Sequence, residues 1–106
     1  MPDYAYFDDL TALLPDAPED SILSRTFLTT DGMKGILFRF AAGQELSEHT
    51  SSQAAVLHFI EGEAAVTLGE DSFEAKPGAW AHMPPRLPHS ILAHTPVTML
   101  LLMYGG

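Results

Sequence analysis

Cysteine is absent from this sequence of 106 residues. Its absence excludes three features together: a disulfide framework, a thiolate metal site and a cysteine nucleophile. Any metal ion bound by this chain must therefore be held by imidazole, carboxylate, amide or hydroxyl groups.

Basic residues are scarce, with 5 lysines and arginines against 14 aspartates and glutamates, which gives a formal net charge of −9. Binding to nucleic acid depends on Lys and Arg side chains that neutralise phosphates, and the sequence contains no basic cluster. An anionic membrane surface is disfavoured for the same reason. We therefore expect neither nucleic acid nor membrane as a partner. Acidic residues gather near the start, which predicts a solvated acidic segment over residues 1–21.

Long apolar runs are absent as well. The longest, near Met99 to Met103, is far shorter than the roughly 20 residues that span a bilayer. The start, Met1-Pro2-Asp3, has no basic region followed by an apolar one, so we expect no signal peptide and a cytoplasmic location. The length fits a single domain, 1–106. A domain of this size buries only about 60–70% of its unfolded surface, so a homodimer would add stability.

Helical periodicity is confined to the beginning of the chain. Leu10, Leu13 and Leu14 recur at helical spacing, Asp8 can cap the segment, and Pro15 ends it. The pattern predicts a short N-terminal helix of one or two turns, followed by a loop to residue 21.

From residue 36 onward the apolar residues follow a period of two, which is typical of half-buried β-strands. Ile36, Phe38 and Phe40 form the first such strand. The sequence therefore predicts an all-β fold, an antiparallel sandwich or barrel with Gly and Pro turns. Further strands are expected over residues 55–60, 64–68, 72–75, 79–83, 90–93 and 97–104.

Two stretches, each opened by a glycine and containing histidine, stand out in this pattern. Their spacing resembles the two motifs of the cupin family, a glycine followed by His-x-His, glutamate and glycine, then a glycine followed by Pro-x-Gly and histidine. The residues at the motif positions are Gly43, His49, Ser51, Ala55 and Gly62 in the first stretch, and Gly78, Pro84, Arg86 and His89 in the second.

The resemblance covers residues 36–104 and implies a single, small RmlC-like cupin domain. Members of the family fold as an antiparallel jelly-roll β-barrel and are commonly dimeric. They hold a divalent metal inside the barrel with three histidines and a glutamate. The resemblance therefore implies a site around His49 and His89.

The sequence departs from the family pattern at three positions. Ser51 stands at the second histidine and Ala55 at the glutamate, so two of the four metal ligands are missing. Arg86 replaces the glycine of Pro-x-Gly, so the loop before His89 can differ in backbone shape, because arginine tolerates positive φ poorly.

A metal site from the remaining histidines is one hypothesis. Two imidazoles alone rarely hold a catalytic metal tightly, since such sites usually have three or more protein ligands. His82 restores that number if it shares a face with His89 across the proline-rich loop; otherwise it is an ordinary strand residue. The expected metal ligands are thus His49, His82 and His89, and the metal Fe, Mn, Ni or Zn. The alternative is two histidines hydrogen-bonded in a polar pocket.

Three further polar residues are candidates for ligand binding. If His49 lies on a regular strand facing the interior, Ser51 and Gln53 face it too, because side chains alternate. The amide oxygen of Gln53 is a poor ligand for transition metals. His58 has the opposite parity to Ala55, so it should point away from the interior, toward solvent or a partner subunit.

Three functions are compatible with these residues. The first is a divalent-metal-dependent enzyme of the dioxygenase, lyase or isomerase type, acting on a small organic substrate in the barrel. The second is a non-catalytic small-molecule-binding or sensor protein with a degenerate metal site. The third is a structural dimer in which the motifs serve turns and packing. Aromatic residues such as Trp80 and Phe59 either line a ligand cavity or belong to the core.

Overall fold

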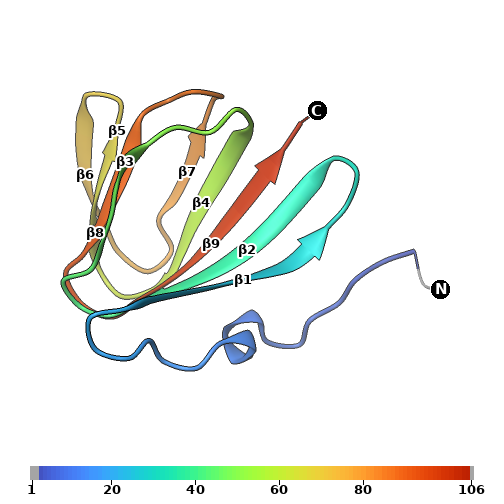
Figure 1. Ribbon diagram of the computed structural model, residues 1–106, viewed down its shortest axis with the longest axis horizontal. Coiled ribbons are helices and arrows are strands. Elements are labelled where there is room, and N and C mark those ends of the chain that lie inside the picture. Colours follow the sequence, from blue (N-terminus) through green and yellow to red (C-terminus); the bar gives the residue numbers. More distant parts are fainter. Residues whose placement is uncertain (1–2, 106) are drawn as a thin grey trace.

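A computed structural model describes residues 3–105 and shows two antiparallel sheets packed face to face (Figure 1). One sheet has the strand order β1-β2-β9-β4-β7 and the other β3-β8-β5-β6. Nearly every segment predicted as a strand is one, which confirms the all-β jelly-roll fold. The strands are β1 (Ile22–Thr29), β2 (Met33–Phe40), β3 (Glu45–His49), β4 (Ala54–Glu61), β5 (Ala64–Leu68), β6 (Asp71–Ala75), β7 (Trp80–Met83), β8 (His89–Ala93) and β9 (Val97–Tyr104).

The core lies between the two sheets because alternate side chains of each strand point inward. Leu57 and Phe59 of β4 are fully buried there, facing Ile91 of β8 from the opposite sheet. Trp80 does not join them. It leaves 63% of its surface exposed on the outer face of the five-stranded sheet, because it pairs with His58 on the outward side of β4. The core interpretation of this tryptophan was therefore wrong.

The beginning of the chain differs from the prediction in detail. The helix is a single 3₁₀ turn, η1 (Leu10–Leu13), and its cap is Asp9, whose carboxylate accepts a hydrogen bond from the Thr11 amide at 3.0 Å. Asp8 is not the cap. The segment runs along the outside of the five-stranded sheet, where Arg39 of β2 donates to the Thr11 carbonyl at 2.7 Å (Figure 1). Residues 1, 2 and 106 lie outside the described part of the chain, and the expectation for Met1 and Pro2 falls on these residues.

Two strands were not predicted. β1 is an edge strand with mostly polar or half-buried side chains, so its apolar alternation is weak. β3 has no buried residue, and its sequence carries no period of two. Both are strands because their backbones pair with β2 and β8 respectively; the first partner is adjacent in the sequence and the second is distant.

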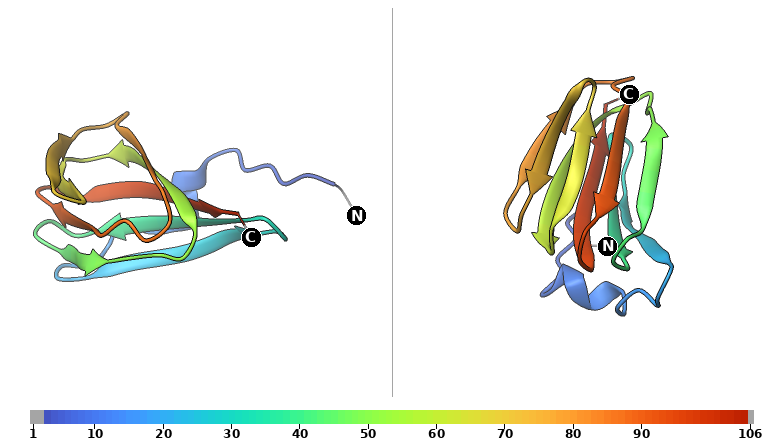
Figure 2. Two further views of the ribbon diagram at one scale, coloured as in Figure 1. Left: turned by 90° about the horizontal axis from the view of Figure 1, so that it is seen from above. Right: turned by 90° about the vertical axis from the view of Figure 1, so that its left-hand side faces the viewer.

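The two sheets face each other without joining along one side (Figure 2). Within residues 3–105, β6 and β7 are the last strands of their sheets and no backbone ladder connects them. The jelly roll is therefore open between these two strands. No helix in the described part of the chain is long and apolar enough to cross a membrane.

Candidate functional site

A β-bulge places His49 against His89. Leu46 of β3 pairs with Ile91 of β8, and the next pair is His49 with His89, so three steps on β3 match two steps on β8. Without the extra residue, Glu48 would follow Leu46 on the inner face and His49 would point outward. The bulge therefore brings the two rings together, with their centroids 4.1 Å apart.

Both imidazoles are anchored in the same manner. Nδ1 of His49 lies 2.8 Å from the Ser47 carbonyl, and Nδ1 of His89 lies 2.9 Å from the Leu87 carbonyl. A carbonyl only accepts, so Nδ1 carries the hydrogen in each ring and donates it. In the neutral rings both Nε2 atoms keep a lone pair for a ligand. No side-chain type in the sequence indicates this anchoring, because the acceptors are backbone atoms, each two residues before its histidine.

The two rings differ in environment. His89 is only 7% exposed, whereas His49 lies at the surface. Burial lowers the pKa of His89 below its ordinary value of 6.5, outweighing the hydrogen bond to the Leu87 carbonyl, which raises it; the charge of nearby His49 lowers it further. His89 is therefore neutral at pH 7, with Nε2 available as an acceptor.

Ser51 and Gln53 do not join the histidine pair. β3 ends at His49, so the strand alternation that would have turned both residues inward does not continue. The Ser51 hydroxyl accepts a hydrogen bond from the Gln53 amide at 3.1 Å. The Gln53 side chain donates to the carbonyl of Gly105 at 3.1 Å. Both side chains stabilise the loop and the end of the chain.

His82 and His58 lie on the outer face of the five-stranded sheet. His82 pairs with Val56 on the outward side of β4, and its Nε2 is 2.7 Å from the hydroxyl of Tyr104. His58 faces outward as its parity predicted, since its neighbours Leu57 and Phe59 are buried in the core. The structure therefore brings His49 and His89 together on the four-stranded sheet. It places His82 apart from them, on the outer face of the five-stranded sheet.

Arg86 adopts the backbone conformation of the residue that it replaces. Its φ is +67°, in the left-handed region, where glycine is favoured. Its amide donates to the Ser51 carbonyl at 2.7 Å, which ties the loop before His89 to the end of the loop after His49. The exchange of glycine for arginine thus leaves the hand of this turn unchanged.

The donors at this site do not fit a tightly held divalent metal. Over residues 3–105 no group of three or more His, Asp or Glu side chains converges, and Ser51 and Ala55 supply no imidazole or carboxylate. A resident metal usually needs at least three protein ligands. Two imidazoles whose Nδ1 atoms are already hydrogen-bonded remain, and an Nε2 atom without hydrogen accepts hydrogen bonds.

A cavity of about 480 Å³ lies beside the pair, between β6 and β7. Leu68 of β5 lines this cavity and is the cross-strand partner of His89. Paired strands lie about 4.8 Å apart, so His89 is one strand spacing from the cavity wall and His49, on β3, is two. Its volume is within the range of pockets for small organic molecules.

Comparison with known proteins agrees with this architecture. The structure superimposes on a protein of unknown function from Streptococcus pyogenes with a TM-score of 0.84 and 27% identity, covering 99% of this chain and 91% of that one. A cupin superfamily protein from Desulfitobacterium hafniense gives a TM-score of 0.85 and 25% identity, with 92% and 88% covered.

A more distant match is salicylate 1,2-dioxygenase from Pseudaminobacter salicylatoxidans, with a TM-score of 0.76, 16% identity, and coverage of 89% of this chain but 29% of that one. This likeness concerns the fold alone. No curated protein matches the sequence. The sequence profile of the cupin domain matches residues 36–104, and the chain therefore belongs to the cupin family.

Proposed function

We propose that this protein binds a small organic molecule inside the barrel and that His49 and His89 hold its hydrogen-bond-donating end. The observation that carries the proposal is the bulge-imposed pairing of two imidazoles whose Nδ1 atoms are both occupied by backbone carbonyls. Polar groups at a half-enclosed site cost free energy unless they find partners, and here the Nε2 atoms are left for a ligand.

The chemistry of the pair selects the ligand's polar group. Neutral Nε2 accepts a hydrogen bond, so the complementary group is a donor such as a hydroxyl. Each such bond between neutral groups contributes about 0.5–1.5 kcal/mol, which corresponds to roughly two- to twelvefold in affinity. The function is thus binding through hydrogen bonds, without a resident metal.

Two probes that differ by one hydroxyl test this proposal. We expect p-cresol to bind at least about twofold more tightly than toluene, because one hydrogen bond to the pair is added. His49→Leu and His89→Leu should remove this difference, whereas His58→Leu should keep it, since His58 faces outward and does not line the cavity. Titration calorimetry of the four proteins measures it. Equal affinities of the two probes for the parent protein would refute the proposal.

The difference in affinity between p-cresol and toluene should depend on pH. Burial lowers the pKa of His89, so its ring becomes charged only as the pH falls below the ordinary histidine value of 6.5. The preference for p-cresol should therefore be present at pH 7 and weaken as the pH falls below the ordinary histidine value. The free energy of unfolding should also decrease as the pH falls below about 6.5, because the folded protein then binds fewer protons than the unfolded chain.

Metal analysis of the purified protein tests the alternative, a metal-dependent enzyme. Free Nε2 atoms on neutral, anchored imidazoles are also the form in which histidine binds metals. Near-stoichiometric Fe, Mn, Ni or Zn in the purified protein, lost in His49→Leu, would replace our proposal with the metal-dependent one. Metal content below a few per cent, unchanged by added metal salts, is the result we expect.

We further propose that two copies associate through the outer face of β4, β7 and β9. The chain carries a net charge of −9, yet the outer face of β4, β7 and β9 carries a single acidic side chain, Glu61 at the end of β4, which lies 3.8 Å from Arg39, so repulsion between two copies is small there. Trp80 and Tyr104 are 63% and 40% exposed on it. The outward residues are Val56, His58, Ile60, Trp80, His82, Leu100, Leu102 and Tyr104.

A negative charge introduced on the outer face of either sheet tests this dimer. Trp80→Asp places a negative charge on the proposed interface, while Leu92→Asp places one on the outer face of the other sheet, where Leu92 is 37% exposed. We expect light scattering to give a dimer for the parent and for Leu92→Asp, and a monomer for Trp80→Asp. A monomeric parent protein, or an intact Trp80→Asp dimer, would contradict the proposed interface.

A further inference from the structure

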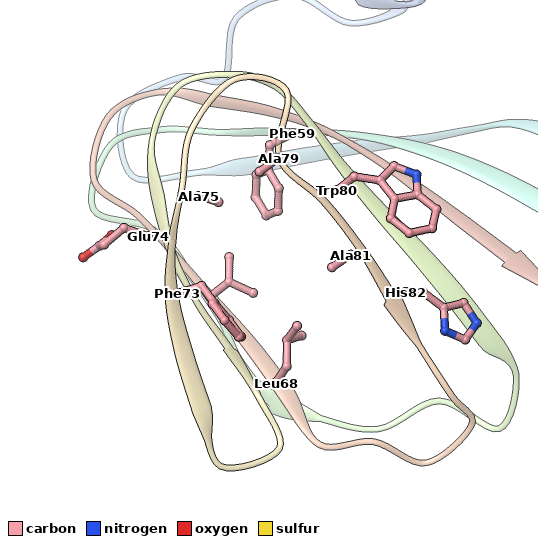
Figure 3. Close-up of a pocket in the computed structure, with 10 residues that line it drawn as sticks. Phe59, Leu68, Phe73, Glu74, Ala75, Ala79, Trp80, Ala81 and His82 are labelled. Carbon is pink, nitrogen blue, oxygen red and sulfur yellow. The ribbon is translucent and has the colours of Figure 1, made fainter.

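The gap between β6 and β7 opens into an apolar cavity that the hydrogen-bonding site does not explain. These strands are the edges of the two sheets, and the cavity of about 480 Å³ lies between them (Figure 3). Figure 3 shows Phe73 and Ala75 of β6 pointing toward this space, with Ala81 of β7 pointing toward it from the other side. The cavity is therefore entered from the side of the jelly roll.

Strand pairing explains which side chains reach the cavity. Phe73 shares a face with Val66, and Ala81 shares one with Leu57, and both partners belong to the core. Trp80, His82 and Glu74 alternate with these residues and point away, as Figure 3 shows. The inward residues are apolar, while Glu74, Trp80 and His82 line only the edge of the cavity: the inward set is Phe59, Val66, Leu68, Phe73, Ala75, Ala79 and Ala81.

Three alanines create the space. Ala75 stands on β6, while Ala79 precedes β7 and Ala81 lies within it, so both edges of the gap carry methyl groups where larger side chains would fill it. Protein interiors are normally packed without voids of this size. Water in a cavity with apolar walls finds few hydrogen-bond partners, so an apolar ligand displaces it favourably.

Phe73 marks the mouth of the cavity. Its ring points inward, yet 54% of the residue's surface is exposed, unlike Phe59 at the cavity wall, which is 1% exposed. An aromatic ring at an open apolar cavity gains both area burial and ring packing when a flat ligand enters. This exposure fits a ring-sized ligand better than a long chain.

From these observations we infer that the cavity, the β6–β7 slot, binds the hydrocarbon body of a ring-sized aromatic or alicyclic compound, and that its alanines limit the ligand's size. Leu68 lines the slot and pairs with His89 on the neighbouring strand, so a ring substituent that extends past Leu68 would meet the histidine pair. The ligand class is then a small cyclic hydroxy compound. Only the hydroxyl part of this statement rests on the proposed function; the apolar slot does not.

Toluene tests the slot alone, because it has no group for the histidines. We expect saturable binding of toluene to the parent protein, measured from amide chemical shifts of β6 and β7. Ala81→Leu should weaken it at least about tenfold, because the larger side chain occupies the ligand's space. Ala65→Leu is the matched control, since Ala65 pairs with Glu74 on the outward side of β5, and it should leave affinity unchanged.

A second variant covers the case in which Ala81→Leu fails to fold. Phe73→Ser removes the exposed ring at the mouth, where the loss of packing in the free protein is small, and should weaken toluene binding at least about threefold through lost contact area. Absence of saturable toluene binding, or full affinity in the slot variants, overturns the inference.

The two proposals fail separately. Toluene binding that responds to Ala81→Leu, without any preference for p-cresol, keeps the slot and refutes the role of the histidines. Preference for p-cresol that responds to His89→Leu, with no response to Ala81→Leu or Phe73→Ser, keeps the histidine site and refutes the slot.

Discussion

Gly62→Ala is expected to destabilise the fold by about 4 kcal/mol or more, a size seen only for backbone or core disruption. Gly62 has a φ of +85°, which L-residues rarely adopt, and a Cβ atom added there would lie 2.0 Å from the carbonyl oxygen of Pro96. The obstacle is backbone that leads into β9, so no side-chain rotation relieves it. Small domains have a total stability of about 5–15 kcal/mol, so much of it is lost.

Gly78→Ala separates the strain of a positive φ from the contact with the Pro96 carbonyl. Gly78 also has a positive φ, +96°, but no atom lies within 4 Å of a Cβ added there. This variant meets only the backbone strain, of about 1–2 kcal/mol, partly offset by the lower entropy of the unfolded chain. Urea denaturation of the two variants measures the difference. Equal destabilisation of Gly62→Ala and Gly78→Ala would show that the contact with Pro96 is relieved.

Phe59→Ala is the second change with a large expected effect, about 3–5 kcal/mol of unfolding free energy. Phe59 is 1% exposed and packs in the core between the sheets while one side of its ring lines the slot. Its removal deletes buried hydrocarbon and enlarges an existing cavity that the surrounding β-sheets cannot collapse to fill.

Phe73→Ala provides the matched control, since the same ring is deleted from the opposite wall of the same slot. Because Phe73 is 54% exposed, this change should cost less than about 1 kcal/mol. Thermal and urea unfolding of both variants gives the comparison. A cost for Phe73→Ala close to that for Phe59→Ala would mean that the slot is closed in solution, with Phe73 packed inside it.

The period of two in the sequence predicted the fold class and seven of the nine strands, because burial of one sheet face imposes alternation directly on the chain. It failed for β1 and β3, whose side chains are mostly exposed or half-buried. These strands exist through backbone pairing, of β1 with the adjacent β2 and of β3 with the distant β8, and hydrogen bonds between backbones leave little trace in residue type.

The glycine spacing of the two motifs likewise located both histidines of the site. The slot was not predicted, because Ala75, Ala79 and Ala81 are unremarkable residues until the two edge strands face one another. A cavity is a property of what surrounds it, and its walls come from strands that are separated in the sequence.

The sequence by itself determined the all-β fold, the family, and the identity of the two histidines, because local alternation and turn residues are read along the chain. Only the tertiary structure decided which histidines meet. The bulge between Leu46 and His49 turns His49 inward, while the pairing of β7 with β4 turns His82 outward. In a β-sheet one residue of register exchanges the two faces, and register depends on partner strands that the local sequence does not contain.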